Sequence, residues 1–299
     1  ILPNNWPSYF KKTKGYKIWG VDNKIYSDMS TMSVGTNILG YSNKEVDNAV
    51  QDVVKNGNLS SLNAPEEVTL AEKLIEIHPW AEMVRFTRTG GEANSVAIRI
   101  ARASTSRHKV AFCGYHGWHD WYLSSNLSKD KKLGFHLFPG VKIKGVPKQL
   151  KNTSIPFFYG DLKSLKKIVS KEKVGIIKME VARSNKPDVK FLKGVRKLCD
   201  ENDIILIFDE CTTGFRENYG GLHKEIGVNP DVAIFGKTLG NGYAINAIIG
   251  KSKIMSNVTN TFISSTFWGE RIGYAAALKS LEVMEKTKSW KKINSLGKK

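Results

Sequence analysis

The sequence predicts an α/β fold with a mostly parallel central sheet and helices on both faces of that sheet. Two observations lead to this prediction. From about Met83 onward, short apolar segments of strand length alternate with amphipathic segments of helical periodicity, a pattern typical of βαβ units. Two of the apolar segments, Ile204–Phe208 and Val232–Phe235, are short and rich in β-branched residues, as expected for strands buried on both faces.

The first part of the chain predicts a small antiparallel appendage and two helices. Residues 15–29 alternate apolar and polar side chains on both sides of Asp22-Asn23, which indicates a β-hairpin. One helix is expected after Ser42, with Gly57 as its stop signal. A second helix is expected to begin at Pro65, with Val68, Leu70, Ala71, Leu74 and Ile75 on its apolar face. We therefore assign residues 1–40 to an N-terminal segment with a hairpin.

Residues 41–270 are expected to form one large α/β domain. Residues 123–152, which are rich in Lys, Gly and Pro, are interpreted as an inserted loop. Residues 271–286 have the apolar stripe of a helix, and we expect residues 271–299 to lead into a small C-terminal domain that the sequence does not include. The remaining strand candidates are Met83–Phe86, Lys109–Cys113, Ile155–Phe158 and Val174–Met179, and the helix candidates are Glu92–Ala103, Leu162–Ser170 and Phe191–Glu201.

The composition is that of a globular protein with a basic surface. Hydrophobic residues make up 41% and charged residues 25% of the chain, and the formal net charge is +18. Such a charge invites a nucleic-acid interpretation, but the lysines are scattered along the chain and form no long run of like charge. We interpret them as a solvated surface, and we expect no nucleic-acid partner.

The cysteines and the hydropathy pattern predict a cytoplasmic protein. Cys113, Cys199 and Cys211 lie in or beside apolar segments and lack the spacing of a disulfide framework, so we expect them to be reduced. No apolar stretch approaches the roughly 18 residues of a membrane span, and the N-terminus lacks the pattern of a signal peptide. We therefore expect no membrane partner.

Charged residues follow both of the buried strand candidates. Asp209 and Glu210 come directly after the first, and Gly236-Lys237 comes directly after the second. Because ligands bind at the carboxyl ends of the strands in open α/β sheets, these residues are candidates for a site. A single lysine there would more often be a solvated loop residue. Other motifs in the sequence must therefore show whether Lys237 belongs to a site.

The segment Thr89-Gly90-Gly91 is a candidate phosphate-binding turn. It lies between a predicted strand and a predicted helix, where backbone N–H groups and the helix N-terminus can bind an anion. A Gly-Gly turn alone is weak evidence. The fingerprints G-x-G-x-x-G and G-x-x-x-x-G-K-[ST] are both absent, which argues against the alternative of an NAD(P)-dependent oxidoreductase.

The aromatic segment that follows the predicted strand Lys109–Cys113 has two interpretations. Cys113, His116 and His119 could ligate zinc, but such a compact set without a distant fourth ligand is uncommon. We favour a site loop in which Tyr115 stacks on a planar ring, and we expect no metal.

Together, the phosphate turn, the aromatic loop, the strand-end acid and the strand-end lysine resemble class III aminotransferases. Within that family they are most similar to the glutamate-1-semialdehyde aminomutase branch. The resemblance implies the aspartate-aminotransferase-like fold type I, with pyridoxal 5'-phosphate as cofactor and a truncated C-terminal small domain. The matching stretches extend from Phe86 to Gly273 and are FTRTGGEANSVAIRIARA, KVAFCGYHGWHD, LIFDECTTGFR, NPDVAIFGKTLGNG and FISSTFWGERIG.

The resemblance implies catalytic roles for two residues. Lys237 would form the Schiff base with the cofactor and move the proton between substrate and cofactor carbons. Asp209 would pair with the pyridine nitrogen and keep it protonated, so that the ring withdraws electrons.

The resemblance also implies a set of cofactor contacts. Tyr115 would stack on the ring with His116 beside it. The phosphate would be bound by the turn Thr89, Gly90 and Gly91, in which Thr89 offers a hydroxyl group.

Three further residues follow from the resemblance alone. Thr266 matches a threonine that reaches the phosphate in the neighbouring subunit, which implies a homodimer with shared active sites. Glu180 matches an acid at the end of a strand near the cofactor, and Asn185 matches a residue that binds the phenolic oxygen of the cofactor.

The implied function is amino-group transfer to or from a small-molecule amine, amino acid or aldehyde, by an aminotransferase or an intramolecular aminomutase. The identity of the substrate stays open, because residues 1–14 show no match to the substrate-binding segment of the aminomutases. An inactive fragment that still binds pyridoxal phosphate is a further alternative.

Overall fold

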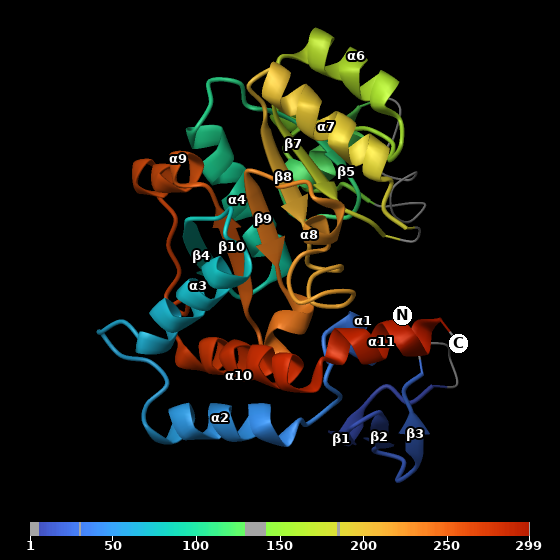
Figure 1. Cartoon of the computed structure of the whole chain (residues 1–299), viewed down its shortest axis with the longest axis vertical. Helices are drawn as coiled ribbons and strands as arrows, with labels where there is room; N and C mark the ends of the chain where they lie inside the picture. The colour runs from blue at the N-terminus through green and yellow to red at the C-terminus, as the bar shows by residue number, and fades with distance from the viewer. Residues whose placement is uncertain (1–5, 30, 129–141, 184–185, 299) are drawn as a thin grey trace.

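The computed structural model of the chain describes residues 6–29, 31–128, 142–183 and 186–298. Within these residues the strands form a seven-stranded sheet and a separate three-stranded sheet (Figure 1). The order of the large sheet is β4-β10-β9-β8-β7-β5-β6. Its strands are β4 (Met83–Thr87), β5 (Lys109–Cys113), β6 (Ser154–Pro156), β7 (Val174–Glu180), β8 (Ile205–Asp209), β9 (Val232–Phe235) and β10 (Asn246–Gly250).

The prediction of a mostly parallel central sheet is confirmed. Neighbouring strands from β9 through β8, β7 and β5 to β6 pair in parallel. Strand β10 runs antiparallel to both of its neighbours, β4 and β9. Strand β10 was not predicted, since its five residues follow a glycine-containing turn without a helix in between.

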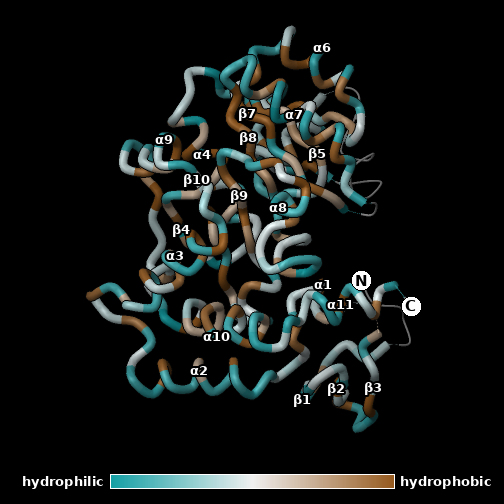
Figure 2. The backbone as a smooth tube through the Cα atoms, viewed as in Figure 1, coloured by the Kyte–Doolittle hydropathy of each residue, from teal (hydrophilic) through white to brown (hydrophobic). Residues whose placement is uncertain are grey.

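Helices cover both faces of the large sheet because successive strand side chains point to opposite faces. On one face, Ile176 and Ile207 pack with residues of α4 (Gly90–Ala103). On the other face, Ile177 and Leu206 pack with residues of α6 (Leu162–Glu172) and α7 (Val189–Glu201). The strands are the most hydrophobic part of the backbone trace in Figure 2.

The N-terminal appendage is an antiparallel sheet of β1 (Phe10–Lys14), β2 (Lys17–Gly20) and β3 (Ile25–Ser27). The predicted hairpin is therefore confirmed, and its turn includes Asn23 in the left-handed region at φ 66°. Strand β1 was not predicted, because its polar sequence FKKTK carries little apolar alternation.

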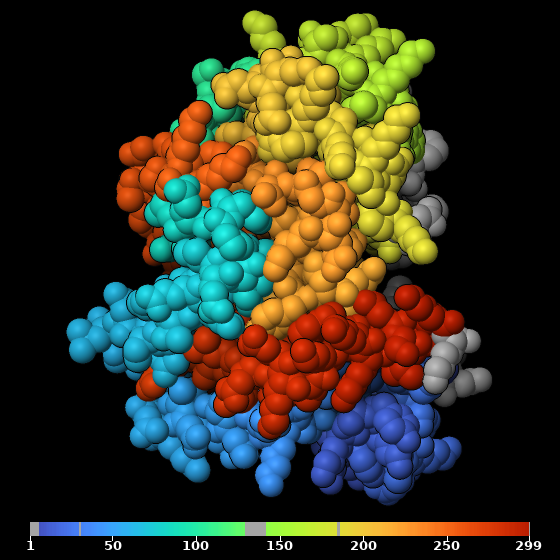
Figure 3. Space-filling view, in the orientation of Figure 1, coloured from blue at the N-terminus to red at the C-terminus, as the bar shows by residue number. Residues whose placement is uncertain are grey.

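The helices of the N-terminal half pack against the C-terminal helix. Helix α2 (Lys44–Lys55) and helix α3 (Pro65–Ile77) both contact α10 (Arg271–Thr287). In the space-filling view the red C-terminal residues lie between the blue N-terminal residues below and the cyan and orange residues above (Figure 3). The prediction for Val68 was wrong. It is 59% exposed, while Leu70 and Leu74 form the buried face of α3.

Several shorter elements complete the described part of the chain. None of its helices is both long enough and apolar enough to cross a membrane. The additional helices are α1 (Met32–Gly35), α5 (Asp120–Leu123), α8 (Leu222–Ile226), α9 (Ser252–Met255) and α11 (Ser289–Gly297).

Element boundaries differ from the predicted ones at positions that matter for the site. Strands β7 and β8 each extend one residue further than predicted and include Glu180 and Asp209 as their last residues. These two acids are Cα partners in the register of the sheet. Helix α4 begins at Gly90 rather than at Glu92, so both glycines of the turn belong to its first turn.

One buried acid joins three elements of the sheet. Asp231 precedes β9, and its Oδ2 accepts hydrogen bonds from the Leu206 amide of β8 at 2.9 Å and from Arg196 of α7 at 2.9 Å. Its Oδ1 accepts from Lys251, next to β10, at 2.7 Å. Burial would raise the pKa of Asp231, but Arg196 and the other donors outweigh burial and lower it.

We expect Asp231→Asn to lower the free energy of unfolding at neutral pH by about 2–4 kcal/mol, because Arg196 would lose its buried counter-charge. The folded pKa of Asp231 is lowered, so its contribution is present above the unfolded value, near 3.8, and is lost as pH falls through the folded value. Urea unfolding of both proteins at about pH 7 and pH 3 checks this. The exposed Asp200 also pairs with Arg196, and Asp200→Asn should change stability by less than about 0.5 kcal/mol. An equal loss in both variants would contradict the assignment.

Candidate active site

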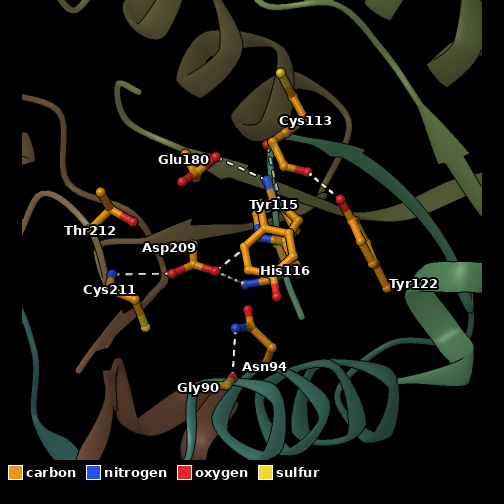
Figure 4. Close-up of polar contacts among 12 residues, drawn as sticks. Gly90, Asn94, Cys113, Tyr115, His116, Tyr122, Glu180, Asp209, Cys211 and Thr212 are labelled. Carbon is orange, nitrogen blue, oxygen red and sulfur yellow. Dashed lines mark hydrogen bonds and ion pairs between the residues drawn. The ribbon is translucent and has the colours of Figure 1, made fainter. Parts of the chain in front are cut away.

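The carboxyl ends of four parallel strands meet at one edge of the large sheet. Asp209 ends β8 and Glu180 ends β7. Lys237 lies two residues beyond β9 at the start of a short 3₁₀ helix, with its backbone in the left-handed region at φ 45°. The aromatic loop with Tyr115 follows β5. The structure thus brings together four of the residues predicted from sequence, and Figure 4 shows three of them, Tyr115, Glu180 and Asp209.

Asp209 is buried and has a donor on each side. Its Oδ2 lies 2.8 Å from Nδ1 of His116, and its Oδ1 accepts from the Cys211 amide at 3.1 Å. Nζ of Lys178 lies 3.7 Å from the same Oδ2. Burial alone would raise the pKa of Asp209, but Lys178 and His116 hold it well below its usual range. Asp209 is therefore an ionised carboxylate at neutral pH.

His116 lies behind Asp209, and it does not line the cavities beside Lys237 that the described residues form. Burial, followed by the positive charge of Lys178, lowers the pKa of His116 to about 4. A neutral imidazole must carry its hydrogen on Nδ1 to donate to the carboxylate of Asp209. The structure thus gives His116 a position from which it orients Asp209.

The aromatic loop reaches the site because two of its glycines adopt positive φ angles. Gly114 has φ 105° and Gly117 has φ 95°, conformations that other residues rarely adopt. A Cβ atom at Gly117 would lie 3.0 Å from the Cα atom of Gly91, so the loop and the start of α4 approach too closely for a side chain. Glu180 fixes the loop from the other side, since its carboxylate accepts from the Tyr115 amide at 2.9 Å.

The N-terminus of α4 offers free amide donors. Thr89 is the N-cap, and it forms a capping box with Glu92. Its Oγ1 accepts from the Glu92 amide at 3.3 Å, which leaves its O–H able to donate. The amides of Gly90 and Gly91 are in the first turn, where an α-helix provides no acceptor of its own. Together with the helix dipole they form an anion-binding position.

Two cavities meet at Lys237. The smaller, of about 330 Å³, is bordered by Gly90, Gly91 and Asp209. The larger, of about 1030 Å³, is bordered by Arg183 and Arg216. Three residues border both cavities, namely Tyr115, Thr212 and Lys237. A group on Nζ of Lys237 can therefore face either space.

Sequence reasoning missed Thr212. Its Oγ1 accepts a hydrogen bond from Nζ of Lys237 at 2.9 Å, and it lies three residues after Asp209 in the segment that follows β8. A hydroxyl group next to a strand-end acid was the available signal.

Sequence reasoning also missed Lys178, a lysine inside the apolar run of β7. The two arginines that border the larger cavity were missed as well. Arg183 binds Glu180 at 3.0 Å and lies over the ring of Tyr115 at 5.7 Å. Arg216 donates hydrogen bonds to the carbonyl oxygens of Thr212 and Gly35.

Two predicted residues have other outcomes. Thr266 is exposed in a turn, and it borders neither of the two cavities that the described residues form at Lys237. Asn185 lies outside the described residues, so its predicted role is not addressed by the structure.

The sequence matches known families and proteins. A family model described as "Aminotransferase class-III" matches residues 3–299. The chain is 36% identical over 310 residues to the 3-aminobutyryl-CoA aminotransferase of Cloacimonas acidaminovorans, covering 100% of this chain and 70% of that protein. It is 33% identical over 290 residues to the glutamate-1-semialdehyde 2,1-aminomutase of Methanothrix thermoacetophila, covering 94% of this chain and 66% of that protein.

The fold of the chain is also similar to those of solved structures. The FumI protein of Sphingopyxis sp. MTA144, in its PLP internal aldimine form, superimposes with a TM-score of 0.84 at 25% identity, over 95% of this chain and 67% of that chain. An omega-transaminase from Sphaerobacter thermophilus superimposes with a TM-score of 0.83 at 25% identity, over 94% of this chain and 67% of that chain. The present chain thus spans 66–70% of the length of these four proteins.

The lowered pKa of His116 predicts a specific dependence of stability on pH. Between about pH 4 and pH 6.5 the unfolded chain binds a proton at this residue and the folded chain does not. The free energy of unfolding should therefore rise with pH across this window. We expect His116→Gln to reduce the rise by on the order of 3 kcal/mol, as measured by urea unfolding at several pH values. His78, with a pKa of about 3, contributes to the remainder.

The exposed His108 provides the control, and His108→Gln should keep the pH profile of the unsubstituted protein. A His116→Gln profile that is also unchanged would show that His116 is protonated in the folded protein.

Proposed function

Because the chain belongs to the class III aminotransferase family, we propose that Lys237 and Asp209 are the catalytic residues of its pyridoxal 5'-phosphate-dependent amino-group transfer. The position of Lys237 carries this proposal. Its Nζ stands where a cavity of cofactor size and a larger cavity share a wall, so one amine can act on both the cofactor and the substrate.

The residues that border the smaller cavity fit the chemistry of the cofactor. The α4 N-terminus, with Gly90 and Gly91, offers amides and a positive dipole to a phosphate. Asp209 is an ionised acid for a ring nitrogen. Tyr115 is an aromatic side chain with an exposed face for a planar ring. The volume of about 330 Å³ lies within the usual range for small-molecule sites.

Bound pyridoxal phosphate supplies an electron-withdrawing ring, which accepts the electron pair left behind when a substrate carbon loses a proton. The protein's contribution is to hold charges and protons at fixed atoms. Asp209 holds a proton on the ring nitrogen by remaining ionised, and His116 keeps the carboxylate in place through its Nδ1–H. The amides of Gly90 and Gly91 hold the phosphate, with Thr89 offering its hydroxyl group.

Lys237 has two tasks in this proposal, covalent attachment of the cofactor and movement of a proton. Thr212 orients Nζ through the 2.9 Å hydrogen bond. Since Thr212 also borders both cavities, it would hold the free amine of Lys237 at their junction.

We assign the larger cavity to the substrate, a small-molecule amine, amino acid or aldehyde. Arg183 and Arg216 border it, and guanidinium groups favour substrates that carry a carboxylate or another anionic group. Glu180 borders the same cavity, where its contact with the Tyr115 amide holds the loop over the cofactor. Both transaminases and aminomutases are among the similar proteins. Either reaction is compatible with the residues that border the larger cavity.

A homodimer with shared sites forms part of the proposal. Thr266 and its neighbour Phe267 are exposed, as is Phe262 at 85%. Large apolar side chains gathered on one exposed loop are typical of a surface that binds another chain. Thr266 is then available to the phosphate of a neighbouring subunit.

We also propose a cytoplasmic location. All three cysteines are free, and Cys113 and Cys199 are buried, as expected for a protein of a reducing compartment.

Lys237 is expected to be the residue that pyridoxal phosphate labels. The protein is incubated with pyridoxal phosphate, reduced with borohydride and digested, and the labelled peptide is identified by mass spectrometry. We expect one dominant label on Lys237, and its loss in Lys237→Ala. The exposed Lys253 is the matched control, and Lys253→Ala should label like the unsubstituted protein. A dominant label elsewhere would falsify the assignment of Lys237.

The need for an amino donor separates the two reactions of the family. We expect an amino donor, mixed in excess with the protein and pyridoxal phosphate, to convert the cofactor to its amine form, as followed by absorbance. Lys237→Ala should slow the proton transfer by at least about 100-fold, the usual contribution of a positioned acid–base group. An isomerisation of one substrate that needs no added donor or acceptor would identify an aminomutase instead. Failure of every donor together with normal labelling would indicate an inactive cofactor-binding protein.

A further inference from the structure

The fully buried Lys178 helps to keep Asp209 ionised, but the function proposed above assigns it no contact with the cofactor or the substrate. It lies in β7, all seven residues of which are buried, and its side chain has no exposed surface. Its Nζ forms no hydrogen bond with any described residue. A lysine in this situation is unusual, because burying an ammonium group is costly unless an opposite charge lies close by.

That opposite charge is Asp209. Lys178 is two residues before Glu180 and two after Ile176, so it points to the face of the sheet that α4 covers. Its Nζ lies 3.7 Å from Oδ2 of Asp209. At this distance the two groups form an ion pair without a hydrogen bond. The Asp209 carboxylate therefore offsets the cost of burying the ammonium group through charge attraction alone.

Other groups around Lys178 leave Asp209 as its main partner. Burial lowers the pKa of Lys178, and the charge of Asp209 opposes this shift, followed by smaller effects of Cys211 and Glu180. Burial lowers the pKa of His116 to about 4. The Glu180 carboxylate already pairs with Arg183. The carboxylate that pairs with Lys178 is thus that of Asp209.

We propose that Lys178 is a positioning residue that acts through Asp209, because it shares that carboxylate with the ring nitrogen of bound pyridoxal phosphate and weakens the nitrogen's hold on its proton. This inference rests on the proposed function of Asp209. A carboxylate that already neutralises an ammonium group attracts a second cation less strongly. The ring therefore withdraws electrons less strongly than it would beside Asp209 alone.

The test compares two ligands that differ only at the ring nitrogen. The first is pyridoxal phosphate, and the second is its analogue in which C–H replaces the ring nitrogen. Dissociation constants of both are measured for the unsubstituted protein and for Lys178→Met. Lys178 affects the binding of the phosphate group equally in both ligands. The ratio of the two dissociation constants therefore reports only the effect of Lys178 on the ring nitrogen.

In Lys178→Met, we expect the preference for pyridoxal phosphate over the analogue to increase by about tenfold, equivalent to one pKa unit at the ring nitrogen. The control is Lys109→Met, which removes a lysine of the neighbouring strand β5 whose partner is Glu172 at 2.7 Å. The ratio of the two dissociation constants in Lys109→Met should equal that of the unsubstituted protein. An unchanged or smaller ratio in Lys178→Met overturns the inference.

Folding and the function of the site are checked separately. Lys178→Gln, a neutral polar variant, should give the same direction of change if Lys178→Met does not fold, as judged by circular dichroism. Borohydride labelling of Lys237 in both variants tests the proposed function independently. Absence of the label would refute that function, whereas a normal label with an unchanged ratio would refute only the role of Lys178.

Discussion

The arrangement of the site depends on keeping one carboxylate ionised inside the protein. Asp209 is the last residue of a strand buried on both faces, where an unpaired charge would be expensive. The surrounding structure meets this cost with a backbone amide from Cys211, an imidazole N–H from His116 and the ammonium group of Lys178. Each of these three groups comes from a different strand or loop, so the sheet register and the aromatic loop must both be correct for the charge to be tolerated.

The backbone conformation positions the loops of the site. Lys237 and the two loop glycines, Gly114 and Gly117, all have positive φ angles, and these turns direct the chain back over the strand ends. The close contact of Gly117 with Gly91 links the aromatic loop to the start of α4. The ring-binding and anion-binding positions are thus fixed relative to each other by backbone rather than by flexible side chains.

Much of this arrangement was predictable from sequence because it depends on local patterns. The parallel strands are continuous apolar runs, and the residues directly after them, such as Asp209 and Lys237, were found by their position. Strand β10 escaped prediction because it follows a glycine-containing turn without a helix in between. Lys178 and Thr212 escaped because their importance arises from contacts across the sheet, and the arginines of the larger cavity because their neighbours are distant in sequence. In particular, Arg216 binds Gly35, a contact that no local pattern indicates.

The boundary between the two cavities has a consequence for how such a protein can change. The smaller cavity is bordered by residues near the ends of strands within the sheet. The larger cavity is also bordered by Tyr16, Asp28 and Ile293, which come from the two ends of the described chain. Most residues of that outer wall do not touch the Asp209 carboxylate or the start of α4. With the larger cavity assigned to the substrate, as proposed above, mutation and selection can alter substrate preference at these positions while the proposed chemistry remains intact, which makes the outer wall a favourable target for directed evolution.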